Sequence, residues 1–465
     1  MSAPARATIA APPAQFDAHV QTVIIGAGAA GLVAALAAQE AGQEVLVLER
    51  DAVPSGSTAL SAGLIPAAGT RFQAQAGIDD DPARFADDIQ KKARGQNDPA
   101  LVDLMTAHAA AAIEWLADRH GLPFSLVDDF DYPGHSRRRM HGLPGRSGQE
   151  LIDALRSAAE GAGADILCEA RVTTLFVQAD RIHGVGFTRP DGATEALGCD
   201  RLILACNGYG GNPALVARHM PKIAGALYFG HPGNQGEALA WGQVLGARIQ
   251  HPGAYQGHGN VAHPHGILIT WAVITEGGFQ VNALGHRFWN EAQGYSEAAR
   301  AVLSQPGGEA VTVFDARIAE VARQFADFRQ AEAQGAIRHA ETMADLAVQM
   351  GLPGPALEES FASFEAAKQG QGRDPFGRVL AGAASLSPPF CAVRVTGALF
   401  HTQGGLAVDA EARVRRADGG VFSNLFACGG AACGVSGAGD AGYLSGNGLL
   451  SAVTLGRLAG QAQSL

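Results

Sequence analysis

Charged side chains are scarce in this chain of 465 residues. They make up 17 % of it, against roughly 25 % in ordinary soluble domains. The 34 lysines and arginines are outnumbered by 45 acidic residues, which gives a formal net charge of −11. A nucleic-acid-binding face needs clustered cations that contact phosphates. The acidic balance therefore predicts no nucleic-acid partner.

Cysteine is also rare. The six cysteines are widely spaced, none forms a C-x-x-C pair, and no Cys/His set has the spacing of a zinc site. We expect reduced thiols in a cytoplasmic protein, and no metal. The C-x-x-C-H motif of attached haem is missing as well. Electrons must therefore reach or leave this chain through a separate carrier.

Long hydrophobic runs are missing too. The most apolar stretch, residues 24–38, is interrupted by glycines and is shorter than the roughly 20 residues of a membrane span. Residues 1–16 are rich in Ala and Pro and lack the apolar run of a signal peptide. We expect no membrane span and a flexible leader over residues 1–16. An apolar fraction of 47 % excludes a disordered chain.

Glycine, in contrast, is abundant, and one cluster of glycines has a specific context. A predicted buried strand, residues 21–25, leads into Gly26-Ala-Gly28-Ala-Ala-Gly31, a helical pattern and a second strand that ends at Glu49. The three glycines permit a tight turn, close approach to a pyrophosphate and helix packing, and the helix N-terminus attracts the phosphates. The terminal acid can accept ribose hydroxyls. This pattern predicts a site for an unphosphorylated dinucleotide, FAD or NAD.

The next segment favours FAD over NAD. Residues 55–63 (SGSTALSAG) are small, hydroxylic and rich in glycine. A long flavin-ribityl arm that lies along the protein needs such a lining. A nicotinamide enzyme would normally continue directly into another strand-helix-strand unit.

From here the chain resembles the fumarate reductase and 3-ketosteroid dehydrogenase superfamily of FAD enzymes. The resemblance covers about residues 20–460. It implies an α/β fold: a discontinuous Rossmann-type FAD-binding domain, residues 17–250 and 400–465, with an inserted α+β capping domain, residues 251–399. Beyond the two segments above, the motifs that carry it are LILACNGYGGN (202–212), GNQGEALAWGQVLGA (233–247), GHRFWNE (285–291), HTQGGLAVD (401–409) and GYLSGNGLL (442–450).

The resemblance implies noncovalent FAD, because Ser57 and Thr58 stand where members with covalent flavin carry His. Two departures concern the same cofactor. Cys206-Asn207 replaces the usual pair of an Ala-Thr-Gly-Gly turn, and Gly430 lies near a position where the family often has a Glu that holds the ribitol. The predicted FAD-binding residues are Gly26, Ala27, Gly28, Ala29, Ala30, Gly31, Glu49, Arg50, Ser57, Thr58, Ser61, Ala62, Gly63, Val172, Ala205, Cys206, Asn207, Gly208, Asn447, Leu449 and Leu450.

Tyr295, a few residues after the R-F-x-N-E motif, bears on the reaction. Fumarate reductases carry a proton-transferring Arg where this chain has Tyr295, whereas ketosteroid dehydrogenases resemble this chain and carry a Tyr there as acid/base. A flavin that desaturates a C–C bond takes a hydride from one carbon while a side chain takes the proton from its neighbour. The resemblance thus implies that Tyr295 is the proton carrier. The alternative is that it only packs under the cap.

The last glycine-asparagine turn has a similar difference. Fumarate reductases hold a substrate carboxylate there with an Arg, which this chain lacks, and Asp440 would repel a dicarboxylate. Tyr443 and Ser445 resemble the ketosteroid dehydrogenase hydroxyls that hold a ketone oxygen, an oxyanion-type effect of about 3–4 kcal/mol per donor. The alternative is a helix N-cap serine beside a packed tyrosine.

Four further residues belong to this picture. His258 and His401 match active-site histidines of the family. Arg139 and Arg287 could meet an anionic substrate, although a solvated run of charge at residues 137–139 is the simpler interpretation of Arg139.

These features predict an FAD-dependent oxidoreductase that acts on CH–CH bonds. It would desaturate a 3-ketosteroid or a smaller cyclic ketone at the α,β position, with an external electron acceptor. The first alternative is an ene-reductase that reduces an unsaturated carboxylate with an external donor. The second is a non-catalytic flavin-binding protein.

Overall fold

The structure is a computed structural model that describes residues 7–464. It consists of two compact units. Unit 1 comprises the residues up to Leu215, together with Gly230–Tyr255 and everything from His401 onward. Unit 2 comprises Val216–Phe229 and Gln256–Phe400. Residues 216–229, expected in the FAD-binding domain, belong to unit 2 because strand β11 (Leu227–Tyr228) pairs with β18 (Phe390–Thr402).

Unit 1 is built on a nine-stranded sheet in the order β1-β8-β9-β10-β2-β3-β7, with β21 on β10 and β20 on β21. Strands β21, β10, β2, β3 and β7 pair in parallel. The second half of β2, Thr22–Ile25, is buried throughout, as expected for a parallel strand covered on both faces. The bounds are β1 Thr8–Ala10, β2 Ala18–Ile25, β3 Val45–Leu48, β7 Asp165–Leu167, β8 Arg171–Gln178, β9 Arg181–Thr188, β10 Thr194–Leu204, β20 Arg413–Arg415 and β21 Val421–Ala427.

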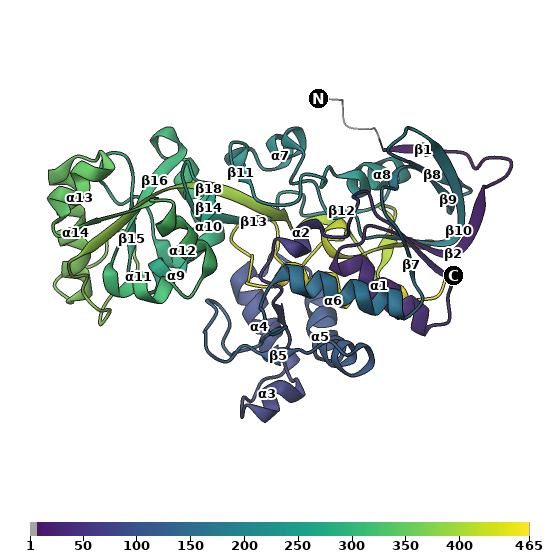
Figure 1. The fold of residues 1–465 in the computed structure, drawn as a ribbon, viewed down its shortest axis with the longest axis horizontal. Coiled ribbons are helices and arrows are strands. Elements are labelled where there is room, and N and C mark those ends of the chain that lie inside the picture. Colours follow the sequence, from purple (N-terminus) through teal and green to yellow (C-terminus); the bar gives the residue numbers. More distant parts are fainter. Residues whose placement is uncertain (1–6, 465) are drawn as a thin grey trace. The chain divides into compact units, whose positions relative to one another are not determined.

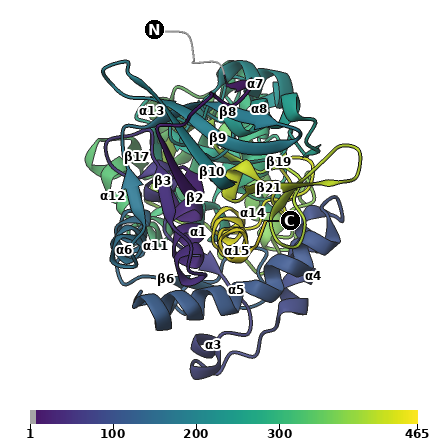
Figure 2. The same cartoon turned by 90° about the vertical axis from the view of Figure 1, so that its right-hand side faces the viewer.

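Two helices pack side by side against this sheet, α1 (Ala29–Glu40) and α15 (Asn447–Gln461) (Figure 2). Their backbones come close because α15 presents glycine to α1. A Cβ at Gly456 would lie 2.6 Å from the Ala30 carbonyl oxygen, and one at Gly460 would lie 2.3 Å from that of Ala34. The pairing brings the start of α15 into the same unit as the glycine-rich turn that precedes α1.

The other elements of unit 1 surround this core. Helix α5 packs against α4 and α15, and α6 packs against α1. The bounds are α2 Gly56–Ala59, β4 Ile65–Pro66, α3 Arg71–Gln75, α4 Pro82–Ala93, α5 Pro99–His120, β5 Ser125–Leu126, β6 Met140–Gly142, α6 Gly148–Gly161, α8 Glu237–Leu245, β12 Ile249–Gln250, β19 Gly405–Leu406 and the 3-10 turn Gly429–Ala431; helix α7, Pro213–His219, lies at the boundary between the units.

The expectation of a flexible leader over residues 1–16 is wrong for β1, which lies in the described part of that segment. Thr8–Ala10 is a strand in parallel register with Thr174–Phe176 of β8. The Thr8 and Thr174 hydroxyls lie 2.7 Å apart, and the Phe16 ring packs edge-on against Phe176. Edge pairing and ring packing order a segment whose composition is that of a linker. Residues 1–6 lie outside the described residues.

Unit 2 is an α+β unit. Its seven-stranded sheet has the order β14-β13-β18-β16-β15, with β11 and β17 also on β18, and helices pack around it (Figure 1). Pairs β15–β16, β16–β18 and β17–β18 are antiparallel. The bounds are β13 Tyr255–Ala262, β14 Ile267–Leu268, α9 Ala272–Thr275, β15 Phe279–Val281, α10 Tyr295–Leu303, β16 Glu309–Asp315, α11 Ala316–Ala322, α12 Ala326–Ala333, β17 Ile337–Ala340, α13 Met343–Met350, α14 Gly354–Lys368, and the 3-10 turns Pro221–Ile223, Glu291–Gln293 and Pro306–Gly308.

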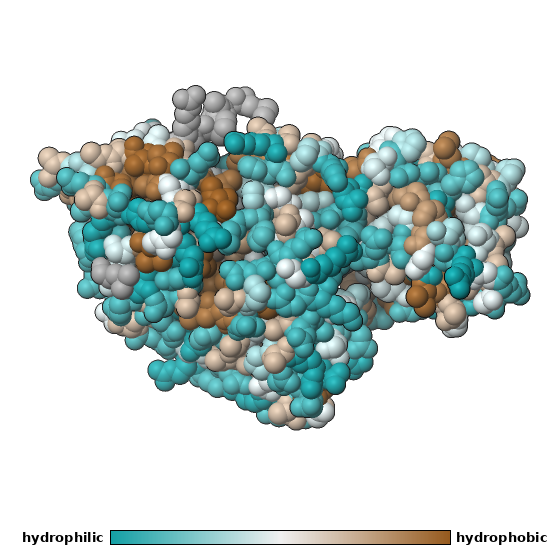
Figure 3. All heavy atoms as spheres, turned by 180° about the vertical axis from the view of Figure 1, so that it is seen from behind, coloured by the Kyte–Doolittle hydropathy of each residue, from teal (hydrophilic) through white to brown (hydrophobic). Residues whose placement is uncertain are grey.

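On the face drawn in Figure 3, hydrophobic side chains form small patches among hydrophilic ones. Among residues 7–464, one helix, α5, is long and apolar enough to cross a membrane by length and composition alone. Half of its most apolar window is buried inside the structure. Core helices of soluble proteins pass the same test.

Candidate dinucleotide and active sites

The glycine-rich turn between β2 and α1 is closed so tightly that side chains would not fit. Gly26 has φ +103°, and a Cβ there would lie 2.7 Å from the Ala205 carbonyl oxygen. A Cβ on Gly31 would lie 1.9 Å from the Gly26 carbonyl oxygen. The first turn of α1 therefore sits directly against the strand end, with its N–H groups at the C-terminal edge of the parallel sheet, where dinucleotides bind.

Glu49 is buried at the end of the second strand. Its carboxylate accepts hydrogen bonds from the backbone N–H of Ala27 at 2.8 Å and of Asp51 at 3.0 Å. A carboxylate has about four acceptor positions, so both oxygens retain capacity for ribose hydroxyls. The neighbouring Arg50 donates to the Gly233 carbonyl oxygen at 2.6 Å, which ties residue 233 to this strand end.

The hydroxyl-rich segment after this strand lies against the start of α1. The Thr58 hydroxyl accepts the N–H of Ala29, the first residue of the helix, at 3.0 Å. The Ser57 hydroxyl accepts from the Asn234 amide at 2.9 Å. Gly63 has φ +66° and packs on the Ser147 carbonyl oxygen. These contacts bring the predicted arm-lining segment and the helix N-terminus together.

Asn207, in the LILACNGYGGN segment, lies against Gly430, the other position at which the sequence departs from the family pattern. Asn207 has φ +63°, a left-handed conformation that Asn tolerates better than most residues. Its amide oxygen accepts the Gly208 N–H at 2.8 Å. A Cβ on Gly430 would lie 2.1 Å from that oxygen. The Asn207 amide therefore occupies the space of a side chain at 430, and the two departures explain each other.

Four polar side chains form a buried chain at the start of α15. Asn447 donates its amide N–H to the Ser436 hydroxyl at 3.0 Å. Ser436 donates to the Gln403 amide oxygen at 2.6 Å, and the Gln403 amide nitrogen lies 2.9 Å from His401 Nδ1. The His401 ring covers Gly448, where a Cβ would lie 2.7 Å from it. Sequence reasoning missed Gln403 and Ser436, although Gln403 lies inside the HTQGG motif.

The other predicted cofactor residues pack in the core of unit 1 or support the segments described above. Val172, Ala205 and Leu450 are buried in the hydrophobic core of unit 1, and Leu449 packs partly buried against it. Ser61 donates to the Thr58 carbonyl oxygen and supports the arm-lining segment. Burial raises the pKa of the Cys206 thiol to about 12, so this residue is a neutral thiol at neutral pH.

Tyr443 and Ser445 lie in the segment that leads into α15. The Tyr443 ring packs edge-on against His401 with centroids 5.6 Å apart, and burial raises the pKa of its phenol. The N-cap of α15 is Gly446, with φ +85°, so Ser445 is not the capping residue of that helix. Both hydroxyl residues are buried in unit 1, which also contains the half-buried His401.

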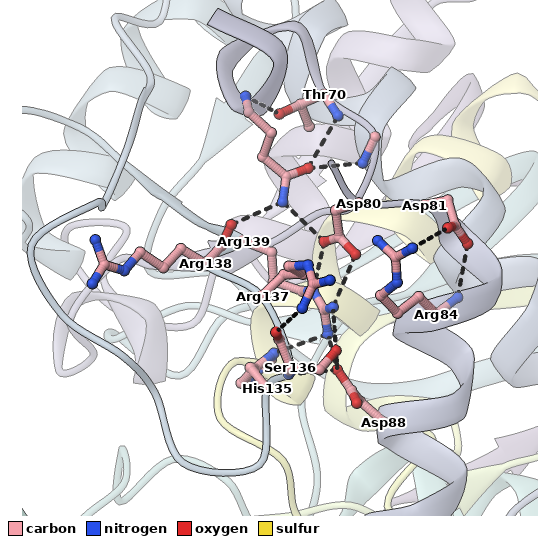
Figure 4. Close-up of polar contacts among 12 residues, drawn as sticks. Thr70, Asp80, Asp81, Arg84, Asp88, His135, Ser136, Arg137, Arg138 and Arg139 are labelled. Atoms are coloured by element: carbon pink, nitrogen blue, oxygen red, sulfur yellow. Dashed lines mark hydrogen bonds and ion pairs between the residues drawn. The ribbon is translucent and has the colours of Figure 1, made fainter. Parts of the chain in front are cut away.

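Arg139 is neither a solvated charge nor a free cation for a substrate. It is 1 % exposed and donates to both Asp80 oxygens at 2.9 and 3.0 Å and to Asp88 at 2.6 Å (Figure 4). Its guanidinium also lies 4.6 Å from the Phe85 ring centroid. Asp80 and Asp88 thus neutralise the buried Arg139, whereas the neighbouring residues 137 and 138 are exposed.

In unit 2, His258 and Tyr295 stack with ring centroids 5.1 Å apart. Gly259 makes this possible, because a Cβ there would lie 2.3 Å from Ala298 of the helix that Tyr295 begins. Trp271 and Phe400 pack on the His258 ring at 5.8 and 5.7 Å. The predicted candidates of the cap therefore belong to one aromatic cluster.

The His258 ring is buried and neutral. Burial lowers its pKa to about 3. The Asn260 backbone N–H donates to Nδ1 at 3.2 Å, so the ring proton of the neutral form is on Nε2. His258 can therefore donate a hydrogen bond and carries no charge with which to bind a carboxylate.

Arg287 is likewise committed to carboxylates. It donates to Glu291 at 3.1 and 2.7 Å and pairs with Asp374. Arg378 shares Glu291 at 3.3 Å. Asp374 comes from a polar stretch that reads as a surface connection, so sequence reasoning had no signal for this pairing. Among the described residues, no group of three or more His, Cys, Asp or Glu side chains could hold a metal ion.

Comparisons with known proteins identify the family of this chain. The model of the FAD binding domain family matches residues 21–449, so the chain belongs to this family. A probable fumarate reductase of Shewanella frigidimarina is 30 % identical over 457 residues, which cover 97 % of this chain and 75 % of that protein. NADH:fumarate oxidoreductase of Klebsiella pneumoniae is 28 % identical over 453 residues. These cover 97 % of this chain but only 48 % of the relative, about half its length.

Two solved structures share the fold. The open conformation of a flavocytochrome c3 fumarate reductase aligns with a TM-score of 0.81 and 29 % identity over 96 % of this chain and 78 % of that one. The 3-ketosteroid-Δ4-(5α)-dehydrogenase of Rhodococcus jostii aligns with 0.78 and 24 % identity over 96 % and 97 %. The predicted superfamily, fold class and FAD cofactor are confirmed, and the chain is an FAD-dependent oxidoreductase.

Proposed function

We propose that this flavoenzyme desaturates a ketone at its α,β carbon–carbon bond, with noncovalent FAD and an external electron acceptor. The observation that carries the proposal is the placement of charge in unit 2. Tyr295 stands where fumarate reductases have a proton-transferring Arg, and it stacks on His258, which Trp271 and Phe400 also contact. A cluster of aromatic rings suits a ketone with an apolar ring better than it suits a dicarboxylate.

The chain's arginines support the same conclusion. Arg139 and Arg287, the two that could have met an anionic substrate, each donate to two buried acids. Removing either guanidinium from its partners would leave uncompensated buried carboxylates, which costs about 3–5 kcal/mol. Recruiting these side chains to a substrate is therefore unfavourable.

The proposed roles in unit 1 rest on hydroxyl chemistry. Tyr443 keeps its proton at neutral pH because burial raises its pKa, so it donates to the ketone oxygen together with the Ser445 hydroxyl. Both bonds strengthen as the oxygen gains negative charge, when Tyr295, acting as its phenolate, takes the α-proton and becomes the neutral phenol. His401 and His258 act as neutral groups that orient the substrate.

Several residues of unit 1 fit the cofactor. Glu49 would hold the ribose, the N–H groups of α1 would face the pyrophosphate, and the start of α15 would stabilise negative charge through its N-terminal dipole. When bound, FAD supplies two-electron acceptance from the β carbon. The cytoplasmic location and the separate electron carrier remain predictions from the cysteine pattern.

A second candidate is the reduction of an unsaturated carboxylate. It is favoured by the relatives named fumarate reductases, of which one is 30 % identical over nearly this whole chain. In this alternative Tyr295 would donate rather than accept a proton, and another cation would have to bind the acid.

Steady-state assays separate the two candidates. The enzyme is tested with saturated 3-ketosteroids and substituted cyclohexanones plus an artificial electron acceptor, and with fumarate and acrylate-type acids plus a reduced dye. We expect turnover of ketones only. Turnover of an unsaturated acid with no ketone oxidised would overturn the proposal in favour of the second candidate.

A further inference from the structure

The segment that carries Tyr443 and Ser445 is fastened by one histidine from a distant part of unit 1. His135 Nε2 lies 3.0 Å from the main-chain carbonyl oxygen of Ser445. On the other side of the ring, Nδ1 lies 3.4 Å from an Arg139 guanidinium nitrogen. A guanidinium can only donate, so Nδ1 accepts and the ring proton is on Nε2. His135 therefore donates to Ser445 from a defined tautomer.

The arginine behind this histidine is itself immobilised. Arg139 makes a bidentate pair with Asp80 and a further bond to Asp88 (Figure 4). Asp88 also accepts from the Ser136 backbone N–H and hydroxyl, both at 2.8 Å. Burial and the nearby Arg139 charge lower the pKa of His135 to about 4, so the ring stays neutral and keeps its donor role at neutral pH.

A second contact ties the same two segments together. Gly134 has φ +87°, and a Cβ there would lie 2.7 Å from the Leu444 side chain. The residue that follows Ser445 is equally confined, since a Cβ on Gly446 would lie 2.6 Å from Pro66. The turn at residues 134–135 thus packs against positions 444 and 445, which follow Tyr443 and directly precede the start of α15.

We propose that His135 is a positioning residue, which fixes the Tyr443–Ser445 segment through the Ser445 carbonyl while the Arg139–Asp80–Asp88 cluster holds its ring. The effect on catalysis rests on the proposed function; the fastening itself does not. Fixing this carbonyl fixes the peptide plane between Ser445 and Gly446. The Ser445 hydroxyl and the Tyr443 phenol are thereby preorganised toward one oxygen position, and no reorganisation is needed when negative charge develops there.

The test uses the FAD-loaded full-length enzyme and three variants. His135→Leu removes the donor. His135→Gln restores a donor at the position of Nε2. His141→Leu is the matched control, because His141 is also buried with a pKa lowered to about 4, and it bonds Thr70, the Arg139 carbonyl and the Ile65 backbone rather than the Ser445 carbonyl. Amide hydrogen exchange over residues 440–447 is measured by mass spectrometry without substrate.

We expect exchange in this segment to be at least tenfold faster in His135→Leu, to be within threefold of wild type in His135→Gln, and to be unchanged in His141→Leu. Equal loosening by the Leu variants, or no loosening by His135→Leu, overturns the proposal. If His135→Leu does not fold, His135→Asn, whose amide is too short to reach, replaces it with the same expectation. On a ketone that is turned over, kcat should fall about tenfold with little change in KM. If no ketone is turned over, the proposed function fails, while the exchange result still decides the role of His135.

Discussion

The two units use charge in the same way and neutral polar groups in different ways. Unit 1 buries Arg139 against Asp80 and Asp88, and unit 2 buries Arg287 and Arg378 against Glu291 and Asp374. In both units the buried ions are partners of each other. The candidate reactive groups are amides and hydroxyls in unit 1 and stacked aromatic rings in unit 2. None of these side chains belongs to the buried ion pairs, which stabilise the two units.

The largest effect is expected where unit 2 supplies the proton carrier. Tyr295→Phe removes one oxygen and keeps the ring stacked on His258. On a verified ketone, kcat should fall about 10²–10⁴-fold, the usual contribution of general acid–base catalysis, while the flavin spectrum stays that of the wild type. Turnover within threefold of wild type would show that Tyr295 only packs in the aromatic cluster.

The buried ion cluster of unit 2 should affect stability instead. Arg287→Met leaves Asp374 without its cation and Glu291 with Arg378 alone, and we expect a loss of about 3–5 kcal/mol in the free energy of unfolding by urea. The control is Arg317→Met, since Arg317 forms an exposed ion pair with Glu276 and should cost less than about 1 kcal/mol. Similar losses in both variants would contradict the structural role assigned to Arg287.

The hydroxyls of unit 1 should affect turnover without affecting the cofactor. Ser445→Ala removes one proposed donor to the ketone oxygen, and loss of such a donor costs about 10²–10³-fold in kcat. The FAD dissociation constant should stay within about threefold of wild type. Measured values of kcat and of FAD fluorescence quenching check both parts; a weaker FAD complex with unchanged kcat would make Ser445 a cofactor residue.

The smallest effect concerns pH. Burial lowers the pKa of His135 and His141 to about 4 and of His258 to about 3, below the roughly 6.5 of an unfolded chain. Between these values the unfolded state binds more protons, so the free energy of unfolding falls as pH drops from about 6.5 to 4. Each proton contributes about 1.4 kcal/mol per pH unit. In urea titrations, His141→Gln should reduce this slope by about one proton, and an unchanged slope would show that His141 titrates normally.

What could be predicted from the sequence is what depends on local patterns. The strand, turn and helix around Gly26, Gly28 and Gly31 follow from spacing alone, and Glu49 follows from the strand that succeeds them. Tyr295, Tyr443 and Ser445 are predicted from motifs that resemble those of the family, and their roles stay predictions. Local sequence thus predicts the cradle and the candidate reactive residues.

The remaining features depend on contacts between residues that lie far apart in the chain. Asp374 meets Arg287 across 87 positions, and His135 meets Ser445 across 310. Neither pairing has a local pattern, and a run of three arginines predicted solvent where one of them is buried. In the sequence, Asn207 and Gly430 are only two separate departures from the family pattern. That the Asn207 amide fills the space of a side chain at position 430 follows from their contact in the fold.

We propose that this enzyme takes its electrons from a ketone. The direct measurement is anaerobic mixing of the oxidised wild-type enzyme and of Tyr295→Phe with saturated 3-ketosteroids and cyclohexanones, followed by the visible flavin absorbance. We expect at least one ketone to bleach the wild-type flavin, and bleaching to be at least a hundredfold slower in the variant. No bleaching by any ketone, with rapid reoxidation of the dithionite-reduced enzyme by an unsaturated acid, would contradict it.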